Sequence, residues 1–205
     1  SAVWRSKRGA AFAATTILQH ARADVGPHLA KLVPRLYRFT HDPNPQTASA
    51  MKRVLKALVD NEDVGAAVTK HLPEILRELV DSCTAREWRV RESACTALAD
   101  VLLGRRYAEV AEQLEPLWLT LLRVIDDVKE TVRKAAMSAL TAVARISVAF
   151  ARCDGATAAE AQKTLELFFP LLLDKGLSSH DPGFAVKQIL ALCKAAGQLL
   201  VPHVA

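Results

Sequence analysis

Two copies of a histidine–aspartate pair are the residues of this sequence that could do catalytic chemistry. They are His41-Asp42 and His180-Asp181, and a proline follows each pair. A carboxylate beside an imidazole can orient that ring as a general base. Each pair nevertheless falls in an expected turn between two helices, and we interpret both as structural turns.

No other combination of residues indicates catalysis. The remaining grouped carboxylates fall on helix surfaces or in turns, where nothing isolates them in a pocket: Glu109, Glu112, Asp126 and Asp127. The sequence contains no glycine-rich phosphate loop, HExxH zinc motif or GxSxG nucleophile motif. We therefore expect no enzymatic activity, no cofactor, no metal site and no small-molecule substrate.

The cysteines indicate neither a zinc site nor a disulfide framework. They lie at scattered helical positions without a CxxC pair: Cys83, Cys95, Cys153 and Cys193. We interpret them as small buried residues of a reduced, intracellular protein.

Charges such as Arg145 and Glu166 interrupt the apolar stretches, so we expect no membrane insertion. The repeat pattern runs through both ends, so we expect the sequence to be part of a longer chain.

A turn motif repeats along the chain at a regular spacing. In this motif an aspartate is followed by four residues, an apolar residue and a cation. It occurs twice complete, once without the acid and once without the cation: Asp127…Arg133, Asp181…Lys187, Ala85…Arg91 and Asp42…Ala48. The cation positions 48, 91 and 133 are 43 and 42 residues apart. With two helices per unit, this period is typical of HEAT repeats.

The motif has a physical role in such a repeat. An aspartate in the turn can cap the second helix of a hairpin, and the cation can reach an aspartate of its own or a neighbouring unit. We therefore interpret the motif as structural, with these members: Asp42, Arg91, Asp127, Arg133, Asp181 and Lys187.

Composition and periodicity predict an all-α fold. Apolar residues make up 51% of the chain and aromatic residues only 5%, while alanine, the best helix former, is abundant. Glycine and proline fall mostly between segments with a helical apolar stripe, and no alternating strand pattern is present. We expect a right-handed HEAT-repeat α-solenoid, an α-α superhelix in which the two helices of each hairpin form separate layers.

We divide the chain into one continuous run of repeats. Its parts are an orphan second helix at 1–24, hairpins at 27–60, 64–104, 107–152 and 156–200, and the start of a further repeat at 201–205. We expect first helices at about Val64–Cys83, where Pro73 interrupts the helix, and at Thr157–Asp174. Pro34 should bend the first helix of the first hairpin or move its start later. Leu98 and Leu140 should be buried at equivalent positions.

Exposed cations near the turns are the candidate protein-binding residues. The net charge is +5, with no polybasic tract. The candidates flank turns and second-helix starts: Arg86, Arg89, Arg105, Arg106 and Lys129.

Trp4 and Trp88 are each followed by arginine, which can stack on the ring, and we favour packing between hairpins for both. Trp118 lies in an apolar run and should belong to the core.

Four segments together resemble one known family. They are Trp4–Phe12, Pro34–Arg38 with Asp42–Asn44, Trp88–Cys95 (WRVRESAC) and Arg123–Arg133. In this order and spacing they resemble the HEAT-repeat proteasome adaptor and scaffold proteins, most clearly over residues 4–155. The resemblance implies an internal segment from the C-terminal half of a very long solenoid. It also implies a cytoplasmic and nuclear protein that tethers the proteasome core particle to its regulatory particle and acts in proteasome quality control.

Two classes of function stay open on the residues themselves. The first is a protein–protein scaffold, with the proteasome as the partner that the resemblance implies. The second is a karyopherin-like carrier or a basic solenoid that grips nucleic acid, and we prefer the first. Binding to phosphates should weaken by orders of magnitude between about 50 and 200 mM salt, which separates the two classes.

Overall fold

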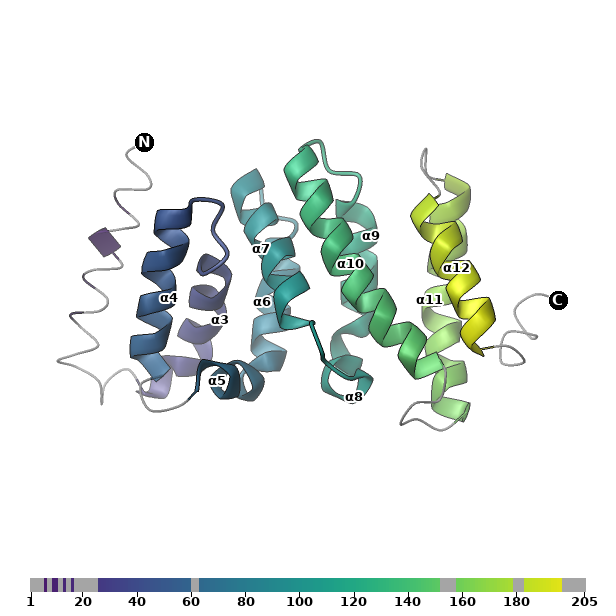
Figure 1. Ribbon diagram of the computed structural model, residues 1–205, viewed down its shortest axis with the longest axis horizontal. Coiled ribbons are helices and arrows are strands. Elements are labelled where there is room, and N and C mark those ends of the chain that lie inside the picture. The colour runs from purple at the N-terminus through teal and green to yellow at the C-terminus, as the bar shows by residue number, and fades with distance from the viewer. Residues whose placement is uncertain are drawn as a thin grey trace.

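The computed structural model describes residues 26–59, 63–151, 158–178 and 183–196, with a few isolated helical positions before residue 26. Every element in these ranges is a helix, and none of the described residues forms a strand. The helices pair into hairpins that stack into an elongated array (Figure 1). The predicted all-α helical-repeat solenoid is confirmed. The segment predicted at 201–205, and nearly all of the helix predicted at 1–24, lie outside the described residues.

The described elements, in chain order, are η1 (Gly26–His28), α3 (Leu29–Phe39), α4 (Pro45–Val59), α5 (Val64–Lys70), α6 (Leu72–Ser82), α7 (Trp88–Val101), α8 (Tyr107–Val110), η2 (Ala111–Gln113), α9 (Leu114–Val124), α10 (Glu130–Ala151), α11 (Ala158–Ser178) and α12 (Gly183–Ala196). The first hairpin joins α3 to α4, and the second joins α5 and α6 to α7. The third joins α8, η2 and α9 to α10, and the fourth joins α11 to α12.

Local sequence signals set where the helices begin. Asn44 caps α4, because its side-chain oxygen accepts hydrogen bonds from the backbone amides of Gln46 at 3.0 Å and Thr47 at 3.1 Å. Pro45 occupies the first helical position, where its missing N–H removes no intrahelical bond. After α7 the chain reverses at Gly104, whose positive φ of 75° is open to glycine at little steric cost.

Proline divides the first helix of the second hairpin. The expected interruption at Pro73 is confirmed, because the segment has two helices, α5 and α6, that meet at His71. His71 leaves the helical region with φ −106° and ψ 19°, and Pro73 follows in the first turn of α6. Pro73 has no N–H to bond the carbonyl of Thr69, and its ring would clash with that carbonyl.

The fourth hairpin differs from the expected bounds. Its first helix, α11, continues to Ser178 instead of ending at Asp174. The Ser178 hydroxyl donates to the Asp174 carbonyl at 2.7 Å within this last turn. Lys175, which was expected in the following link, therefore sits on the helix and forms an ion pair with Asp126 of the preceding hairpin.

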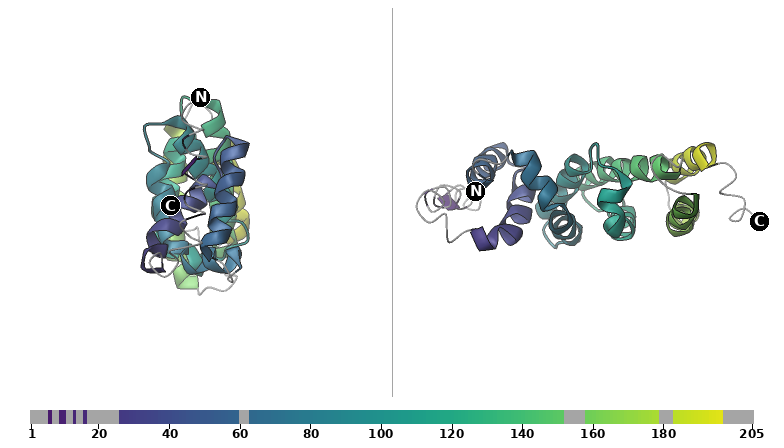
Figure 2. Two further views of the ribbon diagram at one scale, coloured as in Figure 1. Left: turned by 90° about the vertical axis from the view of Figure 1, so that its left-hand side faces the viewer. Right: turned by 90° about the horizontal axis from the view of Figure 1, so that it is seen from below.

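The hairpins form two layers of helices. The second helices α4, α7, α10 and α12 lie in one layer, and the first helices α3, α6, α9 and α11 lie in the other (Figure 2). The extensive contacts join helices of the same hairpin or of adjacent hairpins, such as α7 with α10 and α10 with α12. Stability in such an array comes from each hairpin and its nearest neighbours.

One apolar core runs the length of the described array. Leu98 on α7 and Leu140 on α10 are both fully buried, which confirms the expected burial. Four fully buried alanines on α7 and α10 belong to this core, and these two helices pack against each other: Ala94, Ala97, Ala136 and Ala139. Trp118 is also in this core, as expected. Its indole N–H donates to the Ser147 hydroxyl at 3.1 Å, and its ring stacks on Phe168.

By length and composition alone, α10 could cross a membrane. This differs from our expectation that charges interrupt every apolar stretch. However, 56% of its most apolar window is buried inside the structure, where α10 packs against α7, α9 and α12. Helices at the core of a solenoid share this composition with membrane spans, so the match is weak evidence for a span.

Candidate protein-binding surface

The repeated turn motif joins adjacent hairpins. Arg91, near the start of α7, donates to Asp127 in the turn before α10, at 2.6 Å from Nε and 3.0 Å from Nη2. The other terminal nitrogen of Arg91 donates to the carbonyls of Ala85 and Arg86 at 2.9 Å each. One guanidinium therefore fixes its own turn and binds the next one. From the sequence we expected the motif cation to reach an aspartate of its own unit or of a neighbouring one. For Arg91 the partner is the aspartate of the neighbouring unit.

Asp127 also organises the start of α10. The backbone amide of Lys129 donates to its carboxylate at 2.8 Å, and Arg133 Nη1 donates to its backbone carbonyl at 2.8 Å. The hydrogen bond from Arg91 holds the pKa of the Asp127 carboxyl below its ordinary range, and the Lys129 amide adds to this shift. The same contact raises the pKa of Arg91. Both groups therefore stay charged across physiological pH.

The other motif members are less connected. In the first turn, the Asp42 carboxylate accepts the backbone amide of Asn44 at 2.9 Å, just before α4 begins. Lys187 is exposed on α12. Asp181 and the neighbouring His180 lie outside the described residues, so the structure does not describe a fourth turn.

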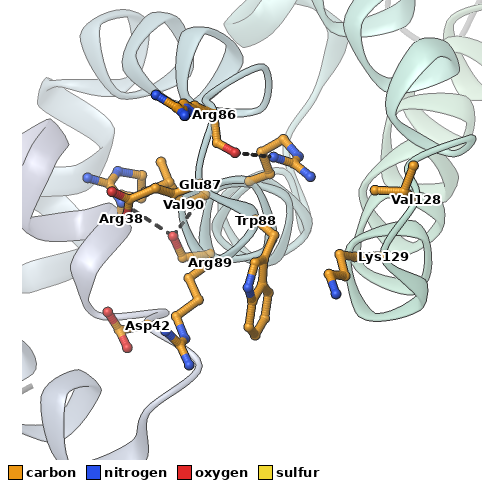
Figure 3. A pocket seen from close by; sticks show the side chains of 11 residues that line it. Arg38, Asp42, Arg86, Glu87, Trp88, Arg89, Val90, Val128 and Lys129 are labelled. Carbon is orange, nitrogen blue, oxygen red and sulfur yellow. Dashed lines mark hydrogen bonds between the residues drawn. The ribbon is translucent and has the colours of Figure 1, made fainter. Parts of the chain in front are cut away.

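Three of the five candidate cations surround one cavity. Arg86 precedes α7, Arg89 lies in its first turn, and Lys129 precedes α10; all three are exposed. They line a cavity of about 510 Å³ beside the turns of the first three hairpins (Figure 3). We call it the cationic groove and define it by six of the residues that line it: Arg38, Arg86, Trp88, Arg89, Val128 and Lys129.

Trp88 both packs against the core and lines the groove. Its ring is half-buried and packs against the core, and the Arg89 guanidinium carbon lies 4.8 Å from the ring centre. In Figure 3 the ring extends from the start of α7 into the space between Arg89 and Lys129. Trp88 therefore stabilises the hairpin and also forms one wall of the groove. Trp4 lies outside the described residues.

The two remaining candidates are elsewhere. Arg105 and Arg106 follow α7, whereas Arg86 and Arg89 lie at its start, so the length of α7, about 20 Å at 1.5 Å per residue, separates the pairs. The expectation that Arg105 is well exposed is wrong. Its side chain is 17% exposed and pairs with Glu109 at 2.9 Å. Arg106 is exposed as expected. The five cations therefore do not form one surface.

The first histidine–aspartate pair is part of the packing between hairpins. His41 Nε2 lies 3.3 Å from the Asp100 carboxylate of α7, and its Nδ1 lies 3.0 Å from the Thr40 hydroxyl. Tyr37 donates to the same carboxylate oxygen at 2.6 Å, and burial raises the pKa of its hydroxyl. These contacts join α3 to α7. The aspartate that meets His41 is therefore Asp100, which sequence adjacency did not identify.

Three of the four grouped carboxylates have structural partners: Glu109, Asp126 and Asp127. Glu109 pairs with Arg105, and its carboxylate accepts the backbone amide of Arg106 at 2.9 Å. Arg106 is the residue just before α8, so this contact caps the start of that helix. The amide of Arg106 and the guanidinium of Arg105 lower the pKa of the Glu109 carboxyl. Asp126 pairs with Lys175. Within the described residues, no group of three or more histidine, cysteine, aspartate or glutamate side chains could hold a metal ion.

Sequence reasoning missed two features. Arg38, at the end of α3, is buried and lines the groove, although arginine is normally exposed. Cys83 and Cys95 are fully buried, as predicted, but the 3.6 Å approach of their sulfur atoms was not predicted. Both belong to expected helices, but no spacing rule brings Cys83 at the end of α6 to Cys95 on α7.

These observations define a HEAT-repeat solenoid whose ionisable turn residues mainly join one repeat to the next. The chain is 42% identical over 205 residues to the human proteasome adapter and scaffold protein ECM29, covering 98% of this chain and 11% of that protein. It is 33% identical to the Drosophila melanogaster proteasome-associated protein ECM29 homolog, over 100% of this chain and 12% of that protein. The Saccharomyces cerevisiae proteasome component ECM29 is 27% identical over 71% of this chain and 8% of its own length.

The chain therefore belongs to the ECM29 family. It spans 11% and 12% of the length of the first two relatives, so it corresponds to a small part of them. No protein-family model matches the chain, and no solved structure matches it.

Proposed function

We propose that this segment is part of a non-enzymatic scaffold that binds the proteasome. The observation that carries the proposal is the similarity along 98% of the chain to a protein named as a proteasome adapter and scaffold. A solenoid suits this role, because its stacked hairpins present long surfaces without requiring a deep pocket. By this proposal, the partner binds to helix ends and turns spread over several repeats.

The contacts that the ionisable residues make within the fold favour a scaffold over an enzyme. Arg91 and Asp127 bind each other, His41 and Tyr37 bind Asp100, and Glu109 supports the start of α8. A general base must be able to reach a substrate proton, and groups held in such contacts serve the fold instead. We therefore assign these residues to the repeat structure and assign binding to the exposed cations.

The family resemblance extends the proposal to the role of the scaffold on the proteasome and to its location in the cell. It favours tethering of the proteasome core particle to the regulatory particle, with a role in proteasome quality control. A cytoplasmic and nuclear location is consistent with the free thiols of Cys83 and Cys95, since those compartments keep thiols reduced.

Lysine-directed crosslinking of the full-length protein on intact proteasomes tests the proposal. Exposed lysines along the array, such as Lys52, Lys129 and Lys187, should form crosslinks to proteasome subunits. A salt series on the same preparation separates the alternative: binding to nucleic acid should be lost steeply between about 50 and 200 mM salt. A full-length protein that does not co-purify with proteasomes, or is released from them by nuclease, would contradict the proposal.

A further inference from the structure

The cationic groove crosses three consecutive hairpins. Arg38 comes from the end of α3, Arg86 and Arg89 from the start of α7, and Lys129 from the turn before α10. Because the repeats place these turns next to one another, cations from separate parts of the sequence line one cavity of about 510 Å³. A ligand in this groove would contact all three hairpins at once.

The groove has an excess of positive charge that the described structure does not neutralise. Cations outnumber carboxylates five to two among its lining residues. Two of the five already face a carboxylate, Arg91 with Asp127 and Arg38 with Glu78 at 3.9 Å, which leaves Arg86, Arg89 and Lys129 against Asp42 and Glu87. The side chains of Arg86, Arg89 and Lys129 form no ion pair within the described part of the chain. They are therefore available to an anionic partner.

Arg38 adds a buried cation to the lining of the groove. This residue is 9% exposed, and its Nε has no hydrogen-bond partner within the described residues. Glu78 is the nearest recorded carboxylate to this nitrogen, at 3.9 Å, beyond hydrogen-bond distance. A buried donor without a partner is destabilising. Nη1 of the same guanidinium donates to the Ser93 hydroxyl at 3.4 Å.

The groove also has an apolar wall. Trp88 is half-buried, and Val128 is 87% exposed beside Lys129. Tryptophan and arginine are enriched where proteins bind one another, so the half-buried Trp88 beside Arg89 suits a binding surface, and the exposed Val128 adds apolar area to it.

We propose that the cationic groove binds an extended acidic segment of a partner protein. Carboxylates of that segment pair with Arg86, Arg89 and Lys129, and an apolar side chain packs against Trp88 and Val128. This inference rests on the proposed scaffold function, since it assigns one surface through which the scaffold binds a protein. It does not require that partner to be a proteasome subunit.

The lining residues favour a peptide over nucleic acid. The carboxylates of Asp42 and Glu87 line the same groove and would repel closely spaced phosphates. Nucleic acid carries a charge at every nucleotide and is bound by continuous tracks of lysine and arginine. A peptide can instead place its carboxylates opposite the cations and leave neutral residues opposite Asp42 and Glu87.

Fluorescence anisotropy with the full-length protein tests this inference. The probe is a fluorescein-labelled, glutamate-rich peptide with one central leucine, and the comparison peptide has glutamine at every glutamate. The groove variant is R86E/R89E/K129E, and the control K52E/R53E/K163E changes the net charge equally at exposed sites outside the groove. We expect the glutamate peptide to bind and the groove variant to lose at least about tenfold in affinity, since three charge-assisted contacts are removed.

The control variant should bind the peptide as the unchanged protein does, and the glutamine peptide should not bind. Equal losses in both variants would overturn the inference, because general attraction would then explain binding. So would absence of binding, or tighter binding of a single-stranded oligonucleotide of equal charge. If the groove variant unfolds at a lower temperature than the control, R86Q/R89Q/K129Q replaces it and must show the same loss. Co-purification of proteasomes with the unchanged protein, measured in parallel, tests the scaffold function separately.

Discussion

Arg91 and Asp127 are 36 positions apart in the chain and form a two-point ion pair that joins the second hairpin to the third. Their side chains are 15% and 9% exposed. Arg91 also donates to the two carbonyls of its own turn, and the Asp127 carboxylate accepts the backbone amide of Lys129 just before α10 starts. The orientation of one repeat against the next therefore depends on a contact in which each partner also holds its own turn.

Removal of either partner should destabilise the segment. We expect Arg91→Ala or Asp127→Ala to lower the free energy of unfolding by about 1–3 kcal/mol, because a largely buried charged group loses its partner. Denaturant unfolding measures the loss, and the double variant should lose less than the sum of the two. As a control, Arg123→Ala should change stability by no more than about 0.5 kcal/mol, since this side chain on α9 is exposed. Additive losses would show that the pair is not coupled.

The same pair predicts a pH dependence. Because the folded-state pKa of Asp127 is below its ordinary value of 3.8, its contribution to stability is complete above that value. This contribution is lost as the pH falls through the lowered pKa. Asp127→Asn should therefore be less stable than the unchanged protein at neutral pH and should lose less stability as the pH falls further below about 4. Parallel stability curves over this acid range would contradict the assignment.

Leu98 on α7 and Leu140 on α10 test the packing of the apolar core. Both are fully buried, so replacement of either by alanine should cost about 2–5 kcal/mol through the cavity that it leaves. Leu119 on α9 is 49% exposed and serves as the matched control, for which we expect a much smaller loss. Thermal unfolding of the three variants makes the comparison. Similar losses of stability at all three positions would mean that the burial of Leu98 and Leu140 does not determine their contribution.

The buried thiols should be unreactive in the folded protein. The hydrogen bond with Cys95 and burial both raise the pKa of Cys83, so little reactive thiolate forms near neutral pH. We expect iodoacetamide to modify Cys83 and Cys95 only after denaturation, as followed by peptide mass spectrometry. Labelling of either thiol in the native protein at the rate of an unfolded peptide would show that this region opens readily.

The repeat period was sufficient to predict the fold, since the spacing of the turn motif and the apolar stripes specify stacked helical hairpins. Helix breaks were harder to predict: Pro73 splits a first helix completely, whereas Pro34 lies inside α3. The groove could be predicted only in part. Arg86, Arg89 and Lys129 were identified as exposed cations, but their meeting in space depends on how adjacent turns stack. Arg38 was missed because burial of an arginine is decided by tertiary packing.

Arg105 and Arg106 are adjacent in sequence but should respond differently to charge reversal. Arg105 donates to the Val101 carbonyl at 3.2 Å, the Thr69 hydroxyl at 3.0 Å and the Glu109 carboxylate at 2.9 Å, so it connects the end of α7 to α5 and α8. Arg105→Glu removes these contacts and places two carboxylates together. We expect it to lower the free energy of unfolding by about 1–3 kcal/mol.

Arg106→Glu should leave stability within about 0.5 kcal/mol of the unchanged protein, because its side chain is exposed and Glu109 binds only its backbone amide. Thermal unfolding of the two single variants measures the difference. Proteasome capture by the full-length protein should then be compared in the Arg106→Glu variant, where a change in binding cannot be attributed to unfolding. If Arg105→Glu proves as stable as Arg106→Glu, the contacts of Arg105 contribute little to the fold, and both cations become available as binding residues.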